Sequence, residues 1–170
     1  IYLEEALFGM SGTMDIDDDV LLDLEFHGEK PDFDLFIAFA PEELIPTLKR
    51  YANEGKVYFD ARLKGHAANE KFPMLDAKFG CENAYFKNSF NETKLDELQF
   101  KGHFHADDIS DLSSMSFSLS DISARPEAGL FKGNIVVKNF LAPDIDMQVD
   151  ADFDLDFLAK FIELENLKKL

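Results

Sequence analysis

The stretch from Pro31 to Gly65 decides the fold, and it reads PDFDLFIAF, then APEELIPTLKRYANEG, then KVYFDARLKG. Its first part places a large apolar residue at every odd position from 33 to 39, which is the period of a strand with one buried face. Its last part alternates in the same way from Val57 to Leu63. Both parts therefore predict amphipathic strands.

The middle part of this stretch changes to helical spacing. Its apolar side chains fall on a single stripe, Leu44, Ile45, Leu48, Tyr51 and Ala52. Prolines at 41 and 46 suit a helix start, and Gly55 suits a helix end. The whole stretch therefore predicts strand, short helix, strand.

A similar pattern occurs near the end of the chain. Residues 143–147 (PDIDM) match residues 31–35 (PDFDL) in type, an offset of 112 (143 − 31). Alternation up to Phe153 then gives way to a helical stripe that includes Phe161, with Asp154 or Asp156 as the N-cap. This indicates an internal repeat with units that start near 31 and 143. A chance match of PDxD in an Asp-rich chain is the alternative.

Alternating apolar residues also mark the rest of the chain. They predict eight or nine strands with hairpin-length connections, including turns at 28–31, 66–72, 87–94, 106–113 and 122–129, and a bulge at 80–83. Short connections favour an antiparallel meander. We therefore expect residues 1–170 to form one mainly β domain, a long curved mostly antiparallel sheet with an apolar concave face and two short helices.

The composition excludes several classes of protein. With 34 acidic and 17 basic residues the net charge is −17, which argues against nucleic acid and against a polybasic contact with anionic lipid. The single Cys81 excludes an internal disulfide and a multi-cysteine metal site. No apolar run approaches the ~20 residues of a membrane span. Because the chain begins without Met or a signal peptide pattern, we expect a piece of a longer protein.

Few residues indicate catalysis or metal binding. His103 and His105 lie two apart on one strand face, where they can chelate a metal that Asp107 and Asp108 complete. No cysteine or third histidine is spaced nearby, so the sequence favours solvated side chains and predicts no metal. The acidic strings 15–19 and 150–156 lack the glycine and glutamate of a calcium loop. Without a nucleophile or cofactor motif, we expect neither an enzyme nor a cofactor.

The apolar strand faces are the remaining candidate site. About nine such strands offer more apolar area than two short helices can cover, so either the sheet closes on itself or an apolar groove stays open for a lipid, another apolar ligand or a neighbouring repeat. Leu48 and Phe161 are expected to close over the groove. The predicted groove residues are Phe33, Leu35, Ile37, Phe39, Val57, Phe59, Leu63, Phe100, Phe104, Phe117, Ile135, Val137, Met147 and Val149.

Four segments carry a resemblance to a known family: 41–65, 79–88, 95–104 and 117–161, which include PEELIPTLKRYANEGKVYFDARLKG and LDELQFKGHF. Together they resemble the AsmA-like family in the form seen in Bacteroidetes-type bacteria, from Thr13 onward. These are similarities of whole phrases rather than of a catalytic motif.

The resemblance implies a periplasmic segment of a large, membrane-anchored envelope protein, built from β-rich repeats around an apolar groove. Such proteins are implicated in outer-membrane biogenesis and in phospholipid movement between membranes. This chain lacks the anchor and most of the length, so the implied function belongs to the parent protein. The implied partners are phospholipid or another apolar ligand and the neighbouring repeats of the parent chain. The alternative is a structural or adhesion-type β module with a closed core.

Overall fold

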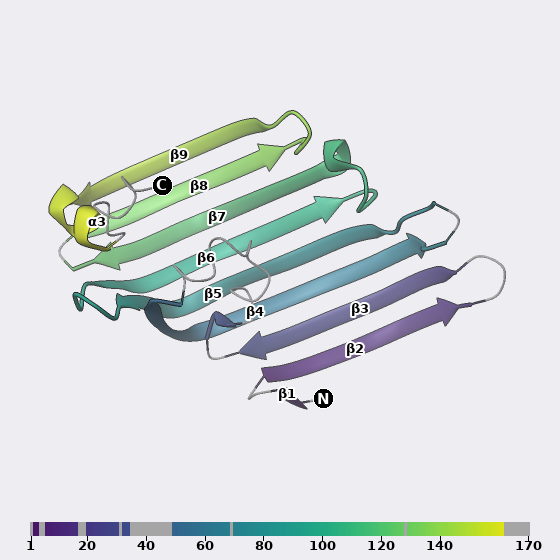
Figure 1. Ribbon diagram of the computed structural model, residues 1–170, viewed down its shortest axis with the longest axis horizontal. Coiled ribbons are helices and arrows are strands. Elements are labelled where there is room, and N and C mark those ends of the chain that lie inside the picture. Colours follow the sequence, from purple (N-terminus) through teal and green to yellow (C-terminus); the bar gives the residue numbers. More distant parts are fainter. Residues whose placement is uncertain are drawn as a thin grey trace.

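The computed structural model describes residues 2–3, 6–16, 20–30, 32–34, 49–68, 70–127 and 129–161. They contain one antiparallel sheet in which nine strands follow one another in chain order (Figure 1). The predicted mainly β class and the meander are confirmed. The strands are β1 (Tyr2–Leu3), β2 (Ala6–Asp15), β3 (Leu21–Lys30), β4 (Tyr51–His66), β5 (Met74–Asn88), β6 (Lys94–Ala106), β7 (Met115–Pro126), β8 (Gly129–Lys138) and β9 (Asp144–Phe153).

Two short helical elements accompany the sheet within the described ranges. A 3-10 turn, η1 (Leu112–Ser114), connects β6 to β7, and α3 (Leu155–Phe161) follows β9. The second predicted helix is therefore present. The first predicted helix lies partly outside the described residues, at 41–48. Its predicted last turn is wrong, because residues 51–55 belong to β4.

The glycine that suggested the helix end has another role. Gly55 lies in β4 opposite a bulge of β5, where the pairing of the two strands shifts between Glu54 and Lys56. A Cβ atom on Gly55 would lie 2.3 Å from the Cβ atom of Ala84, closer than side chains approach. Gly55 therefore permits close contact between two strands.

The predicted strand at 33–39 is also wrong where the structure describes it, because Asp32 and Phe33 form a bend and Asp34 is helical. The Asp34 amide donates to Asp32 Oδ1 at 3.0 Å, and the Asp156 amide donates to Asp154 Oδ1 at 2.9 Å at the start of α3. An Asp-x-Asp cap thus precedes helical backbone at both places.

This shared cap relates residues 32–39 (DFDLFIAF) to residues 154–161 (DLDFLAKF), an offset of 122 (154 − 32). The two segments that share a local structure are therefore the capped helix starts, 122 residues apart. The PDFDL and PDIDM segments, 112 residues apart, do not share one where the structure describes them. Repeat units near 31 and 143 stay a prediction. Residues 35–39 lie outside the described part of the chain.

Two strands are longer than the sequence predicts. β3 runs through Gly28 to Lys30, and β7 runs to Pro126, where turns were expected. In β7 the pairing with β8 shifts between Leu119 and Ile122, and Asp121 takes a positive φ of 54°. This bulge absorbs the irregular sequence without ending the strand. The connections at 67–73, 89–93 and 107–114 and the bulge in β5 confirm the other predicted breaks.

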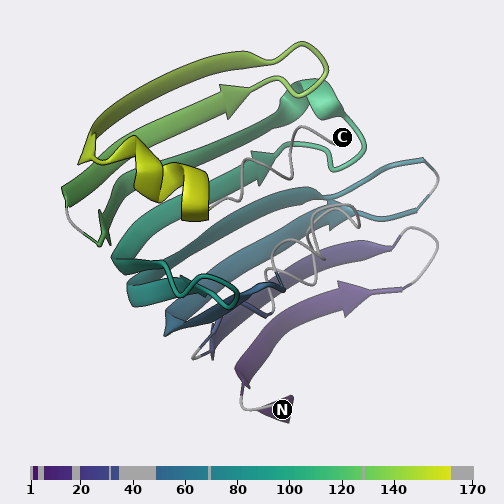
Figure 2. The same ribbon diagram turned by 60° about the vertical axis from the view of Figure 1, so that its left-hand side comes forward.

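The helix α3 is held at one end of the sheet. Its Phe161 carbonyl accepts hydrogen bonds from Tyr51 Oη at 2.6 Å and from Asn88 Nδ2 at 3.1 Å. Asn91 Nδ2 donates to the Lys160 carbonyl at 2.7 Å. The Tyr51 and Phe161 rings also pack, with centroids 5.0 Å apart. A helix that follows edge strand β9 is thereby tied to β4 and to the turn between β5 and β6 (Figure 2).

The Asp154 cap gives a first prediction. Asp154→Ala leaves the Asp156 amide without its acceptor, so we expect the free energy of unfolding to fall by about 1 kcal/mol. Urea denaturation checks this value. Asp152→Ala removes an exposed carboxylate from β9 and serves as the control, with an expected change within about 0.5 kcal/mol. Equal losses in the two variants would show that the cap contributes nothing.

The thiol of Cys81 gives a second prediction. Its residue is 1% exposed beside Val57 and Ala84, and burial raises the pKa of the thiol to about 12. At pH 8 we expect the folded chain to react with a disulfide reagent on the order of a thousand times more slowly than the chain in urea, because the thiolate is the nucleophile. Absorbance of the released thiolate measures both rates. Similar rates would contradict this packing.

Candidate functional site

The pairing register turns one set of alternate side chains to the side of the sheet on which α3 packs. Phe153 lies on this side, since its ring contacts that of Phe157 on α3 at a centroid distance of 6.0 Å. Residues paired with one another across neighbouring strands share a face of the sheet. One such row crosses four strands and consists of Phe104, Phe117, Val137 and Ile145. We call this side the apolar face and the other side the polar face.

Every predicted groove residue that lies in a described strand is on the apolar face. The register places them together in five strands of the sheet, and they are Val57, Phe59, Leu63, Phe100, Phe104, Phe117, Ile135, Val137, Met147 and Val149. Leu35, Ile37, Phe39 and Leu48 lie outside the described residues.

Phe33 is placed differently from the prediction. It lies outside the strands, and its amide donates to Asn53 Oδ1 on β4 at 2.7 Å. Its side chain is buried at 6% exposure, with ring centroids 4.7 Å from Phe86 and 6.4 Å from Phe100. Phe33 therefore covers part of the apolar face instead of belonging to it.

Several apolar residues near these groups were absent from the predicted set. The ring of Phe79 stacks on Phe117 at 6.0 Å and contacts Phe100 at 6.3 Å, and Phe140 contacts Phe104 at 6.2 Å. Phe79 ends the alternation of Leu75 and Ala77, a signal that could have included it. Phe140 lies in a turn, where no strand period applies.

Exposure along the apolar face rises toward the edges of the sheet. Val57 near the centre is 2% exposed. On β9, Ile145 is 60% exposed and Met147 is 64% exposed, and Met10 on β2 reaches 66%. Large apolar side chains are therefore in contact with water at both ends of the sheet.

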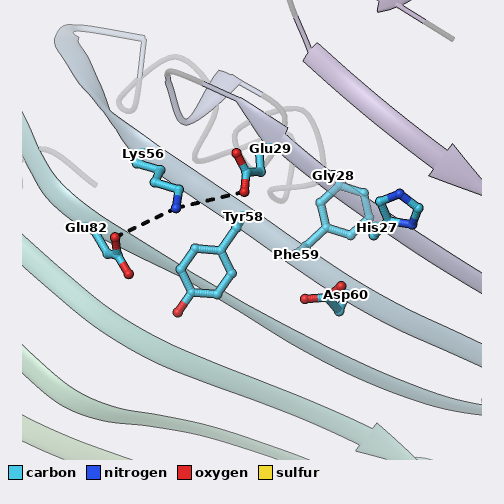
Figure 3. A pocket seen from close by; sticks show the side chains of 8 residues that line it. All are labelled: His27, Gly28, Glu29, Lys56, Tyr58, Phe59, Asp60 and Glu82. Atoms are coloured by element: carbon cyan, nitrogen blue, oxygen red, sulfur yellow. Dashed lines mark ion pairs between the residues drawn. The ribbon is translucent and has the colours of Figure 1, made fainter.

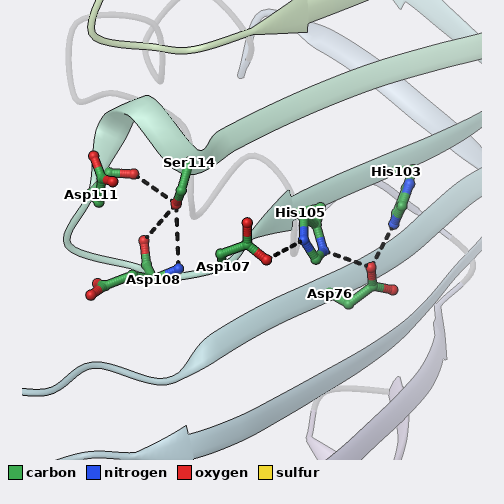
Figure 4. Close-up of polar contacts among 7 residues, drawn as sticks. All are labelled: Asp76, His103, His105, Asp107, Asp108, Asp111 and Ser114. Carbon is green, nitrogen blue, oxygen red and sulfur yellow. Dashed lines mark hydrogen bonds and ion pairs between the residues drawn. The ribbon is translucent and has the colours of Figure 1, made fainter.

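The polar face carries a cluster of imidazole and carboxylate groups (Figure 4). Asp76 on β5 lies opposite His105 on β6. Asp76 Oδ2 is 2.8 Å from His103 Nε2 and 3.0 Å from His105 Nδ1. The second ring nitrogen of His105, Nε2, is 3.2 Å from Asp107 Oδ1. The cluster thus includes the predicted His103, His105 and Asp107 and adds Asp76, which only the strand register brings to them.

Asp108, which the sequence also associated with the histidines, has a different role. Its Oδ1 accepts hydrogen bonds from the amide and the hydroxyl of Ser110, both at 2.7 Å. Its amide and carbonyl also contact Ser114 Oγ. Asp108 therefore shapes the turn between β6 and β7 (Figure 4).

The cluster shifts the protonation of two of its members. The hydrogen bond with Asp76 raises the pKa of His105. Partial burial opposes this rise, and the hydrogen bond with Asp107 adds to it. For Asp76, partial burial raises the pKa, but the hydrogen bonds with His103 and His105 outweigh it and hold the pKa below its usual value. The geometry therefore favours a carboxylate between two imidazole groups.

A shallow hollow lies elsewhere on the polar face, between β3, β4 and β5 (Figure 3). Lys56 Nζ is 3.9 Å from Glu29 and 4.0 Å from Glu82, and Tyr58 and His27 also line the hollow. These charged side chains are more than half exposed, so their ion pairs are weak. The hollow suits a small polar molecule at most.

Comparison of the chain with protein-family models, with curated proteins and with solved structures finds no match. The described residues include no helix with the length and apolar character that a membrane span needs. The resemblance to AsmA-like proteins stays a prediction.

The pH dependence of stability tests the histidine cluster. The pKa of His105 is raised above its ordinary 6.5, so its stabilising effect is complete below that pH and is lost as the pH rises through the raised value. We expect Asp76→Asn to lose more unfolding free energy at pH 6 than at pH 9, as measured by urea denaturation. His27→Gln should show no such difference. A loss that grew with pH would contradict the assignment.

Proposed function

We propose that this chain is a non-enzymatic, periplasmic segment of a larger membrane-anchored envelope protein of the AsmA-like type, and that it binds phospholipid acyl chains on its apolar face. The observation that carries this proposal is the continuity of the apolar face from β2 to β9, with Met10, Ile145 and Met147 more than half exposed. Exposed apolar surface of this extent on one side of a sheet is typical of a binding surface.

The dimensions support an open groove. Nine strands at a spacing of ~4.8 Å give a sheet ~38 Å wide, whereas a seven-residue helix such as α3 is ~10 Å long. Among the described residues, α3 and Phe33 cover one end of the apolar face, and Phe140 contacts Phe104 at the other end. The sheet is visibly curved (Figure 2), and we take the side of α3 as the concave side that would enclose an acyl chain.

The edge of the sheet supports a role for neighbouring repeats. β9 is a ten-residue strand whose described partner is β8 alone, and nine of its residues are exposed. A long unpaired edge accepts a further strand, because its backbone groups are available. A following repeat of the parent chain would extend both the sheet and its apolar face.

A structural or adhesion-type β module with a closed core is the second candidate. One observation favours it: Val57, Cys81 and Ala84 are buried together under Phe33. This packed region shows that part of the apolar face serves as an ordinary core. The two candidates differ in the role of the exposed apolar residues near β9. They would bind lipid in the first candidate and would not in the second.

Native mass spectrometry of the chain purified from bacterial cells distinguishes them, followed by extraction of any bound lipid. A phospholipid that co-purifies at a defined stoichiometry is expected. A mass free of ligand, together with no uptake of phospholipid from added micelles, would favour the closed module.

A charge-matched pair of variants tests the face itself. Met147→Asp places a charge on the apolar face, and Gln148→Asp places the same charge on the polar face of the same strand. Both positions are exposed, so we expect each variant to fold. Met147→Asp should weaken binding of a fluorescent acyl-labelled phospholipid about tenfold, the loss of ~1.5 kcal/mol of apolar contact. Equal effects of the two substitutions would overturn the assignment.

A further inference from the structure

We propose that Asp76, His103 and His105 form a binding site for one divalent transition-metal ion of the zinc type on the polar face. The three residues offer one carboxylate oxygen and two imidazole nitrogens, and these atoms all lie within 4.8 Å of one another. Imidazole and carboxylate are the ligands that suit zinc, whereas Mg²⁺ and Ca²⁺ prefer oxygen alone.

The spacing of the donors agrees with coordination of one small ion. Bonds of about 2.0–2.1 Å in a tetrahedral site place neighbouring ligand atoms ~3.3 Å apart. Asp76 Oδ2 is 2.8 Å from His103 Nε2 and 3.0 Å from His105 Nδ1. Binding of one ion by all three atoms would lengthen these two contacts by a few tenths of an ångström. It would also bring the two imidazole nitrogens, which lie within 4.8 Å of each other, to the same spacing.

The backbone holds the donors in place. His103 and His105 project from the same face of β6, and Asp76 is the register partner of His105 on β5. Neighbouring paired strands keep these three side chains together without any loop. An ion at this place would connect β5 to β6 across their ladder.

Asp107 supplies the outer partner that a metal-bound histidine usually has. Its Oδ1 is 3.2 Å from His105 Nε2, the ring nitrogen that does not face Asp76. With the proton held on Nε2, the lone pair of Nδ1 points toward Asp76 and is free to bind a metal. A carboxylate in this position orients the ring and strengthens the ligand.

The cluster is open to solvent and to ions. The side chains of Asp76, His103 and His105 are 34%, 44% and 33% exposed. Three protein ligands in such a setting leave a fourth position for water or for a donor from another molecule. The net charge of −17 attracts cations, whereas Lys78, the register partner of His103, opposes them locally.

Isothermal titration of the untagged, EDTA-treated chain with Zn²⁺ tests the site. We expect one ion per chain, and at least tenfold weaker binding in Asp76→Asn, His103→Gln and His105→Gln. Asp107→Asn should weaken binding about tenfold through the orientation of His105. Histidine side-chain NMR should show coordination through His105 Nδ1, which a general effect of charge would not produce.

His27→Gln is the matched control. His27 lies on the same polar face in the register row of Asp60, Lys78 and His103, with its backbone about 14 Å from that of His103. This variant should bind Zn²⁺ as the unchanged chain does, and millimolar Mg²⁺ should not compete. Circular dichroism confirms that each variant is folded. No binding at 100-fold molar excess of Zn²⁺, or binding that persists in the folded His103→Gln, His105→Gln double variant, would overturn the proposal.

Discussion

The register of the antiparallel ladder is the constraint on which the rest of this structure depends. Side chains in a strand alternate between two faces, so a slip of one residue would send every apolar group of that strand into water. Bulges in β5, β6 and β7 interrupt the ladder but restore the same face afterwards. Asn83, Glu97 and Asp121 have positive φ angles at these bulges, and their conformations accommodate the shift.

A consistent register gives the sheet two faces with different chemistry. The apolar face carries the phenylalanines of the described strands, and a buried cluster forms on it where Phe33 packs against Val57, Cys81 and Ala84. The polar face gathers ion pairs such as Arg62 with Asp23 and the cluster around Asp76. The proposed lipid site on one face and the proposed metal site on the other therefore use different side chains.

The attachment of α3 shows how a polar contact can position an apolar helix. Asn88 is fully buried, and its side chain donates to the Phe161 carbonyl and accepts from the Phe90 amide. A buried amide with satisfied partners stabilises one arrangement, because any shift would leave it unpaired. The Asn-rich turn that the sequence marked only as a loop thus also fixes the position of α3.

The sequence by itself determined the mainly β class, the chain-order meander, the strand faces and the helix after β9, because these follow from local periods and short connections. It misread residues 32–34, since DFDLFIAF fits both periods and only the Asp32 cap and the contact of Phe33 with β4 decide between them. The tertiary structure alone brought Asp76 to His103 and His105. Asp76 precedes His103 by 27 positions and His105 by 29 positions in the chain. Only the pairing of β5 with β6 brings them together.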